Sequence, residues 1–141
     1  MSTGAGNQLV APLGAFTQQA AAAALLGPII PLSKSQAIPM PATGSGLRQP
    51  GIYAITKAGV AALTLAAPVA GADDGVLLHI FSTTANAHTI TTPAAGDIQD
   101  GNTSGYDTVM TFNAYKGANC TLRAYQGVWY AISEIGCSLT S

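Results

Sequence analysis

The segment from Gly51 to Gly136 alternates short runs of β-branched and aromatic residues with clusters of Gly, Pro, Asp and Asn. Branched and flat side chains fit the pleated, half-buried surface of a sheet. The intervening residues suit turns, because they supply positive φ, a fixed φ or local side-chain hydrogen bonds. The pattern predicts an all-β module, and because helices do not alternate with the strands, it excludes a doubly wound fold.

Seven strands are predicted in this module, at Ile52–Lys57, Ala62–Ala66, Val76–Ser82, Ala87–Thr91, Thr108–Asn113, Asn119–Tyr125 and Val128–Glu134. Apolar and polar residues alternate clearly at Leu63–Leu65 and Met110–Phe112, which predicts one face in the core and antiparallel pairing. We therefore expect residues 51–141 to form an antiparallel, jelly-roll-like β-sandwich. No convincing internal repeat is found.

Residues 1–50 are predicted to form an N-terminal arm. A short helix is expected over about 15–26, because Ala and Leu favour helices and Gly27-Pro28 ends the run. Five prolines between Gly27 and Pro50 exclude a helix or a central strand there. This stretch is expected to be extended and to lay its apolar side chains on the domain or on a partner, with a hinge at residues 43–46.

Charged residues make up only 8% of the 141 residues, whereas about 25% is usual. Charge is depleted from the buried cores of protein interfaces, so this composition favours a protein that works while held against another protein. The alternative is a compact β-domain with a Thr- and Ser-rich surface. The net charge of −1, without a cluster of Lys and Arg, argues against nucleic-acid binding.

The N-terminal residues predict neither a secretory signal nor a membrane span. The first positive charge is Lys34, whereas a signal peptide has a charged start before its apolar run. Ala20–Leu26 is apolar but far shorter than the ~18 residues that a membrane span needs.

The two cysteines, Cys120 and Cys137, are predicted to remain reduced. A hairpin that turns at Gln126-Gly127 places Cys120 opposite Ser133 rather than Cys137, and disulfide geometry is strict. Two isolated thiols and synthesis in a reducing cytoplasm are therefore expected.

No catalytic site, metal site or cofactor is predicted. His79 and His88 are the only histidines, and no second ligand lies at a diagnostic spacing from either, so a structural role is favoured. The serines lack the Gly-x-Ser-x-Gly elbow of a hydrolase.

The aspartates could be read as paired carboxylates or as turn residues. The candidates are Asp73, Asp74, Asp97, Asp100 and Asp107. All lie in or beside Gly-rich turns, where Asp caps its own backbone, so turn chemistry explains them. A calcium site formed by the last three with Asn102 is the weaker alternative, because the spacing is not that of an EF-hand.

The residues predicted to contact a partner are apolar residues of the arm and two aromatic residues of the last hairpin. They are Phe16, Leu25, Leu26, Ile29, Ile30, Leu32, Ile38, Met40, Trp129 and Tyr130. Trp and Tyr are favoured at interface hot spots. A lone Trp in a small β-domain also suits the core, so the two interpretations of Trp129 stay open.

Six stretches of the β-module carry a family resemblance: Tyr53–Thr56, Leu63–Leu65, Pro68–Gly75, Ala87–Thr91, Phe112–Gly117 and Thr121–Trp129. Together they resemble small virion proteins of tailed bacteriophages, in particular the capsid cement, or decoration, proteins that lie outside the major capsid shell. The resemblance covers Gly51 to Gly136 and not the arm.

This resemblance implies a non-enzymatic protein of the outer capsid surface, made in the host cytoplasm, that clamps neighbouring capsid subunits. Its partners would be the major capsid protein and further copies of itself, with a homodimer favoured over a trimer, and neither nucleic acid nor membrane. The arm would order on contact, and repeated attachment would add avidity.

Two other functions remain in view. The first is a tail-fibre or receptor-binding module, which could bind carbohydrate through Trp129 or Tyr130 and the loop from Pro93 to Gly105. The second is an enzyme that uses His79 or His88, for which replacing either histidine would abolish activity without affecting folding.

Overall fold

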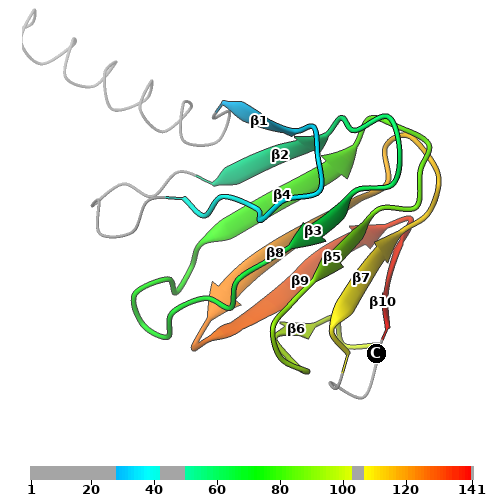
Figure 1. Ribbon diagram of the computed structural model, residues 1–141. Coiled ribbons are helices and arrows are strands. Elements are labelled where there is room, and N and C mark those ends of the chain that lie inside the picture. Colours follow the sequence, from blue (N-terminus) through cyan, green and yellow to red (C-terminus); the bar gives the residue numbers. More distant parts are fainter. Residues whose placement is uncertain (1–27, 42–49, 103–106, 141) are drawn as a thin grey trace, which may run out of the picture.

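The computed structural model describes residues 28–41, 50–102 and 107–140, which form ten strands and no helix (Figure 1). The strands are β1 (Ile29–Leu32), β2 (Gly51–Ile55), β3 (Ala62–Thr64), β4 (Leu77–Ser82), β5 (Thr89–Thr91), β6 (Ile98–Gln99), β7 (Val109–Phe112), β8 (Asn119–Tyr125), β9 (Val128–Ile135) and β10 (Cys137–Thr140). The all-β prediction is confirmed. The helix and the hinge predicted for the arm lie outside the described residues.

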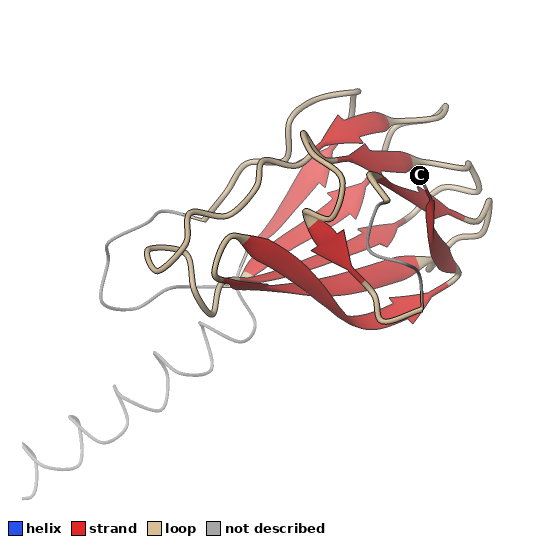
Figure 2. Cartoon of the chain, turned by 90° about the horizontal axis from the view of Figure 1, so that it is seen from below, coloured by secondary structure: helices blue, strands red, loops and turns tan. Residues whose placement is uncertain are grey.

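The strands form two sheets around one core (Figure 2). Sheet A has the order β1-β2-β4-β8-β9-β6, and sheet B has the order β10-β7-β5-β3. Fully buried side chains come from both sheets, among them Tyr53 and Leu122 of sheet A and Leu63 and Ile90 of sheet B. Burial of each such side chain stabilises the fold by about 1.5–3 kcal/mol, so the core joins the sheets into one unit.

The first half of the chain winds as a coil between the sheets. From β2 in sheet A the chain passes to β3 in sheet B, returns to sheet A as β4 beside β2, and returns to sheet B as β5 beside β3. Both pairs are parallel, and β1 adds a further parallel pair with β2. This is the arrangement of a β-solenoid, so the prediction of a wholly antiparallel, jelly-roll-like sandwich is wrong for this half.

Equivalent positions of β2 and β4, and of β3 and β5, are 27 residues apart, whereas the separation between β1 and β2 is 23 residues. Ile52 pairs with His79, and Ala62 pairs with Thr89. The same separation joins Ala37 to its bridge partner Thr64. The repeat escaped the sequence analysis because successive turns of the coil share their inward and outward alternation rather than residue identities.

The second half of the chain is mainly antiparallel, as predicted, and its one parallel pair joins the two-residue strand β6 to β9. β8 pairs with β4 and β9, and β7 pairs with β5 and β10. The β8–β9 hairpin turns at Gln126 and Gly127, whose φ values of 47° and 83° are those of a type I′ turn. The Asp74 carboxylate fastens this turn, accepting hydrogen bonds from the Gln126 backbone at 2.8 Å and its side-chain amide at 2.7 Å.

Residues 28–41 of the proline-rich segment belong to the β-module, which corrects the expected boundary at residue 51. Leu32 and Ile38 lie in the core, and Met40 packs against it. The Tyr53 hydroxyl donates a hydrogen bond to the Pro39 carbonyl, and burial raises the pKa of Tyr53 to about 12. Proline is tolerated in β1 because that strand lies at the edge of sheet A.

Candidate functional site

The outer side of sheet A is unusually apolar. Paired residues of neighbouring strands point to the same side of a sheet, so the register defines each row of side chains. One such row runs from Ile29 through Ile52 and His79 to Thr121. We call the whole outer surface of β1, β2, β4, β8 and β9 the apolar face: Ile29, Pro31, Ile52, Ala54, Leu77, His79, Phe81, Asn119, Thr121, Arg123, Tyr125, Val128, Tyr130, Ile132, Ser133 and Ile135.

Large exposed apolar side chains concentrate on this face. Among the described residues nine such side chains are exposed, and five belong to the apolar face: Ile29, Tyr125, Tyr130, Ile132 and Ile135. A contiguous apolar surface on a small domain indicates an interaction site. Of these five, Ile29 and Tyr130 are among the partner-contacting residues predicted from the sequence, and Tyr125, Ile132 and Ile135 are not.

A β-bulge in β9 adds one apolar residue to this face. Thr121 pairs with Ser133, whereas its neighbour Leu122 pairs with Ala131, so Ile132 is an extra residue in the strand. Two residues of a bulged strand oppose one residue of the partner, and here the Ile132 side chain is 52% exposed. The bulge cannot be read from the alternation of the sequence, which explains why Ile132 was missed.

The bulge also changes the surroundings of the cysteines. Cys120 pairs with Glu134 rather than with Ser133 as expected. The chain then leaves sheet A at Gly136, whose φ is 64°, and brings the Cys137 thiol against Cys120. The hydrogen bond that the Cys120 thiol donates to Cys137, together with burial, raises the pKa of Cys120. Both thiols are free, as predicted, but they are adjacent and not isolated.

Glu134 occupies the inward side of the same strand. Its Oε1 atom is buried and accepts no hydrogen bond from the described residues. Burial, followed by the negative charge of Asp100, raises the pKa of Glu134. The ionised carboxylate is therefore a local cost to the fold.

Arg123 is the only residue of the apolar face with a permanent charge. It is exposed on β8, between Leu77 on β4 and Tyr130 on β9. No member of the face has a carboxylate. Within the described ranges, no ion pair joins Arg123 to a carboxylate. An apolar surface that holds Tyr and Arg side chains has the composition typical of an interface core.

His79 lies on the apolar face. Its Nδ1 atom is 2.8 Å from the Thr121 hydroxyl, and its ring centroid is 5.8 Å from that of Phe81. Burial lowers the pKa of His79, so the ring is neutral at pH 7.

His88 is fully buried near the start of β5 and makes structural hydrogen bonds. Its Nδ1 atom accepts a hydrogen bond from the Ala61 backbone at 3.0 Å, so the proton lies on Nε2, 2.8 Å from the Thr84 hydroxyl. That hydroxyl donates to the Lys57 carbonyl. Burial, followed by the charge of Lys57, lowers the pKa of His88. These contacts join successive turns of the coil and agree with a structural role.

Four of the five aspartates cap turns, as predicted, and Asp74 does so by accepting a hydrogen bond from the Gly71 backbone at 3.1 Å. Asp73, Asp97 and Asp100 each accept a hydrogen bond from a backbone N–H two to four residues away, at 2.6, 2.9 and 2.8 Å. Asp107 is buried. Within the residues that the structure describes, no three His, Cys, Asp or Glu side chains gather as metal ligands.

Three predicted partner-contacting residues are core residues instead. Trp129 is 0% exposed, and its indole N–H donates to the Ala66 carbonyl at 2.9 Å. Leu32 and Ile38 are likewise buried, so none of the three presents a surface to a partner. Ile30 is exposed, whereas Phe16, Leu25 and Leu26 lie outside the described residues.

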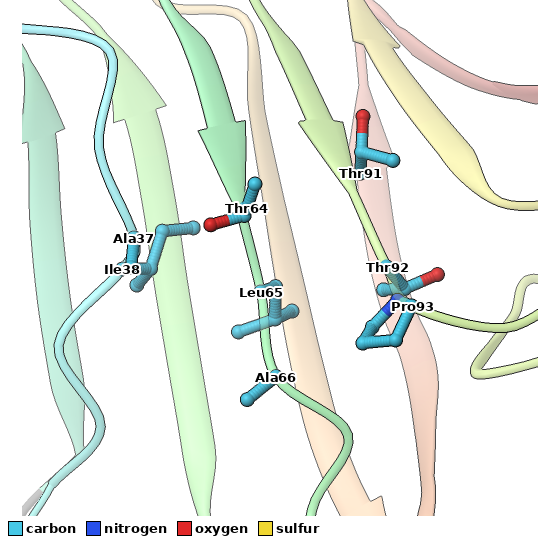
Figure 3. Close-up of a pocket in the computed structure, with 8 residues that line it drawn as sticks. All are labelled: Ala37, Ile38, Thr64, Leu65, Ala66, Thr91, Thr92 and Pro93. Carbon is cyan, nitrogen blue, oxygen red and sulfur yellow. The ribbon is translucent and has the colours of Figure 1, made fainter.

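A groove of about 400 Å³ lies on the side of sheet B, where three successive turns of the coil present equivalent residues (Figure 3). It is lined by Ala37, Ile38, Thr64, Leu65, Ala66, Thr91, Thr92 and Pro93. The lining has no aromatic or charged side chain. The groove therefore differs from the aromatic pocket expected of a carbohydrate-binding module.

No model of a known protein family matches this chain, and no curated protein matches its sequence. The described part of the chain contains no helix with the length and hydropathy that a membrane crossing requires.

Proposed function

We propose that this protein is a structural virion protein that binds the outside of a bacteriophage capsid and stabilises it by clamping neighbouring major capsid subunits. The observation that supports the proposal is the apolar face, on a chain in which only 8% of residues are charged. A domain that worked alone in water would gain nothing from this surface, whereas a partner that covered it would bury five large apolar side chains.

The size of the face suits a clamp that acts through many copies. With strands ~4.8 Å apart and ~3.3 Å per residue, its plan area is on the order of 500 Å². A stable interface buries about 800 Å² on each partner. One copy would therefore bind with modest affinity, and a cluster of copies would gain strength from repeated attachment.

Association with further copies, as a dimer or a trimer, would use a surface other than the edge of β1. Pro31 lies in that edge strand and lacks a backbone donor. Proline on an edge discourages the addition of another strand. Contacts between copies would therefore use another part of the molecule.

The test is to purify the native particle that contains this protein and to count its copies by quantitative mass spectrometry. We expect hundreds of copies, removed together from the capsid shell by mild denaturant, and a shell that melts at a lower temperature without them. A handful of copies at a tail, or no particle at all, would contradict the proposal.

The alternative function is a tail-fibre or receptor-binding module that binds carbohydrate. Exposed Tyr125 and Tyr130 on the apolar face favour it, because aromatic rings can stack on sugars. Trp129 cannot contribute, since it is buried. A glycan screen in which Tyr130→Ala abolishes a specific signal would support this alternative over the capsid.

A further inference from the structure

Arg123 lies on the part of the apolar face nearer the β8–β9 hairpin turn. Its strand β8 is flanked by β4 and β9, whereas β2 and β1 begin beyond the level of Leu77 and do not reach the row of Arg123. Leu77 and Tyr130 lie directly opposite Arg123 on the two neighbouring strands. Tyr125, two residues along β8, points to the same side of the sheet and is exposed. A partner that covers the exposed Tyr125 and Tyr130 side chains must therefore also cover the guanidinium group beside them.

A partner that covers this cation must supply a negative charge to it. An Arg buried without an anion loses its hydration and is strongly unfavourable, whereas a carboxylate accepts two parallel hydrogen bonds from the guanidinium. A second copy cannot supply that carboxylate from the same face, because the apolar face contains none. Two such faces pressed together would instead place two arginines in one apolar interface.

The surroundings of Arg123 also favour a carboxylate over a phosphate as the anion that it binds. Surfaces that bind nucleic acid through phosphates carry several clustered cations. Here Arg123 is alone among Leu, Ile, Val and Tyr side chains, and His79 is neutral at pH 7. One fixed cation within an apolar surface matches one acidic side chain within another apolar surface.

We infer that the apolar face docks on a protein surface that is itself apolar and presents an Asp or Glu carboxylate to Arg123. The inference rests on the proposed function in one respect: the capsid subunit is the protein expected to supply that carboxylate. Arg123 is then a specificity-determining residue, which rejects apolar surfaces that lack an acid, including the same face of another copy.

The first test is the cryo-EM structure of the native particle. We expect the Arg123 guanidinium to contact an Asp or Glu of a different protein. Contact with another copy of this chain, with a phosphate or with solvent would overturn the inference. If the acidic partner belonged to a tail protein, the carboxylate inference would stand and the capsid proposal would fail.

The second test measures the binding of full-length variants to capsid shells depleted of this protein. Arg123→Gln should weaken binding roughly 30-fold or more, and Arg123→Glu further still, whereas Arg123→Lys should retain part of the affinity. Lys116→Gln is the matched control, since it removes the same charge from an exposed turn outside the apolar face. Thermal unfolding should be unchanged in all four variants.

Two outcomes of the binding test separate the inference from the function. If Arg123→Gln bound shells as tightly as the native protein, the carboxylate inference would be wrong and the capsid function would stand. If the native protein did not bind shells, the capsid function would be wrong, and the cryo-EM contact of Arg123 would decide the inference.

Discussion

The two outer surfaces of this protein differ although both are built from short strands of one chain. The outer side of sheet B, which we call the hydroxyl face, consists of Ala62, Thr64, Thr89, Thr91, Val109, Thr111, Ser138 and Thr140. The apolar face of sheet A has Ile, Leu, Phe and Tyr in the corresponding outward positions. Neither face is rich in charged side chains. Hydroxyl-bearing side chains take their place on the hydroxyl face, and large apolar side chains take their place on the apolar face.

The low charge content was compatible with a surface that binds another protein or with a compact β-domain whose surface is rich in Thr and Ser, and each face fits one of the two. Threonine and serine hydroxyls hydrogen-bond to water, so the hydroxyl face is an ordinary uncharged surface of a β-domain. The apolar face has fewer hydroxyl groups and exposes large apolar side chains, Ile135 at 62% and Tyr130 at 44%. The proposal of a partner therefore rests on sheet A and not on the composition as a whole.

The largest expected effect is a difference in the free energy of unfolding between substitutions at two adjacent residues of β9. Trp129 lies on the inner side of sheet A, and Tyr130 lies on its outer side. Trp129→Ala should lower the free energy of unfolding by about 3–5 kcal/mol, because it empties a core site and removes the hydrogen bond to Ala66. Tyr130→Ala should change it by less than about 0.5 kcal/mol. Urea unfolding of both variants is the measurement, and equal losses would contradict the assignment of the two faces.

The next effect compares the two outer faces directly. The double variant Tyr130→Ser and Ile132→Ser should weaken partner binding by about 2–4 kcal/mol, because both side chains lie on the apolar face. The matched control on the hydroxyl face, Thr64→Ser with Thr91→Ser, should bind like the native protein. Co-sedimentation with depleted capsid shells measures both, and a weaker control would show that sheet B also contacts the partner.

A pH-dependent effect sharpens the contrast between the two histidines. The lowered pKa of folded His88 means that the unfolded chain takes up a proton first as the pH falls below about 6.5. Stability should therefore decrease from pH 6.5 down through the folded pKa, because the charged ring loses the hydrogen bond from Ala61.

The measurement for this prediction is urea unfolding between pH 7.5 and 4.5. His88→Asn should be less stable at pH 7.5, and its stability should vary less with pH. His79→Asn is the comparison variant: the pKa of His79 is also lowered, so this variant should remove a part of the pH dependence while it leaves the hydrogen bond from Ala61 to His88 in place. If His79→Asn removed most of the pH dependence instead, the assigned role of His88 would be incorrect.

The smallest expected effect concerns the inward side of the bulged strand. The raised pKa of Glu134 means that ionisation opposes folding, so its unfavourable contribution is absent at low pH and appears as the pH rises through the folded pKa. Glu134→Gln should stabilise the protein by less than about 1 kcal/mol at pH 7.5, and by less at pH 4. Thermal unfolding at both pH values tests this, and a loss of stability at pH 7.5 would contradict it.

Sequence reasoning located seven of the ten strands, and the three it missed have physical explanations. β1 contains a proline and was assigned to the arm, although an edge strand tolerates proline. β6 has only two residues, and β10 follows directly from β9 through Gly136. In each case pairing with a neighbouring strand, rather than local preference, defines the strand.

The candidate site was less predictable than the fold. A strand with apolar residues on both sides shows no alternation of polar and apolar residues in the sequence. The sequence therefore does not reveal that Trp129 lies in the core and Tyr130 on the surface. The place of Ile132 on the outer side of the sheet depends on the bulge, which the sequence does not reveal. The apolar surroundings of Arg123 are set by the strands that pair with β8.

By itself the sequence determined the all-β class, the antiparallel hairpin of β8 and β9 and its turn at Gln126-Gly127, because propensity, alternation and turn chemistry act over a few neighbouring residues. Only the tertiary structure decided the parallel coil, the bulge and the separation of an apolar face from a hydroxyl face. These features depend on which distant strands lie side by side, and a shift of one residue in that pairing exchanges the inner and outer sides of a strand.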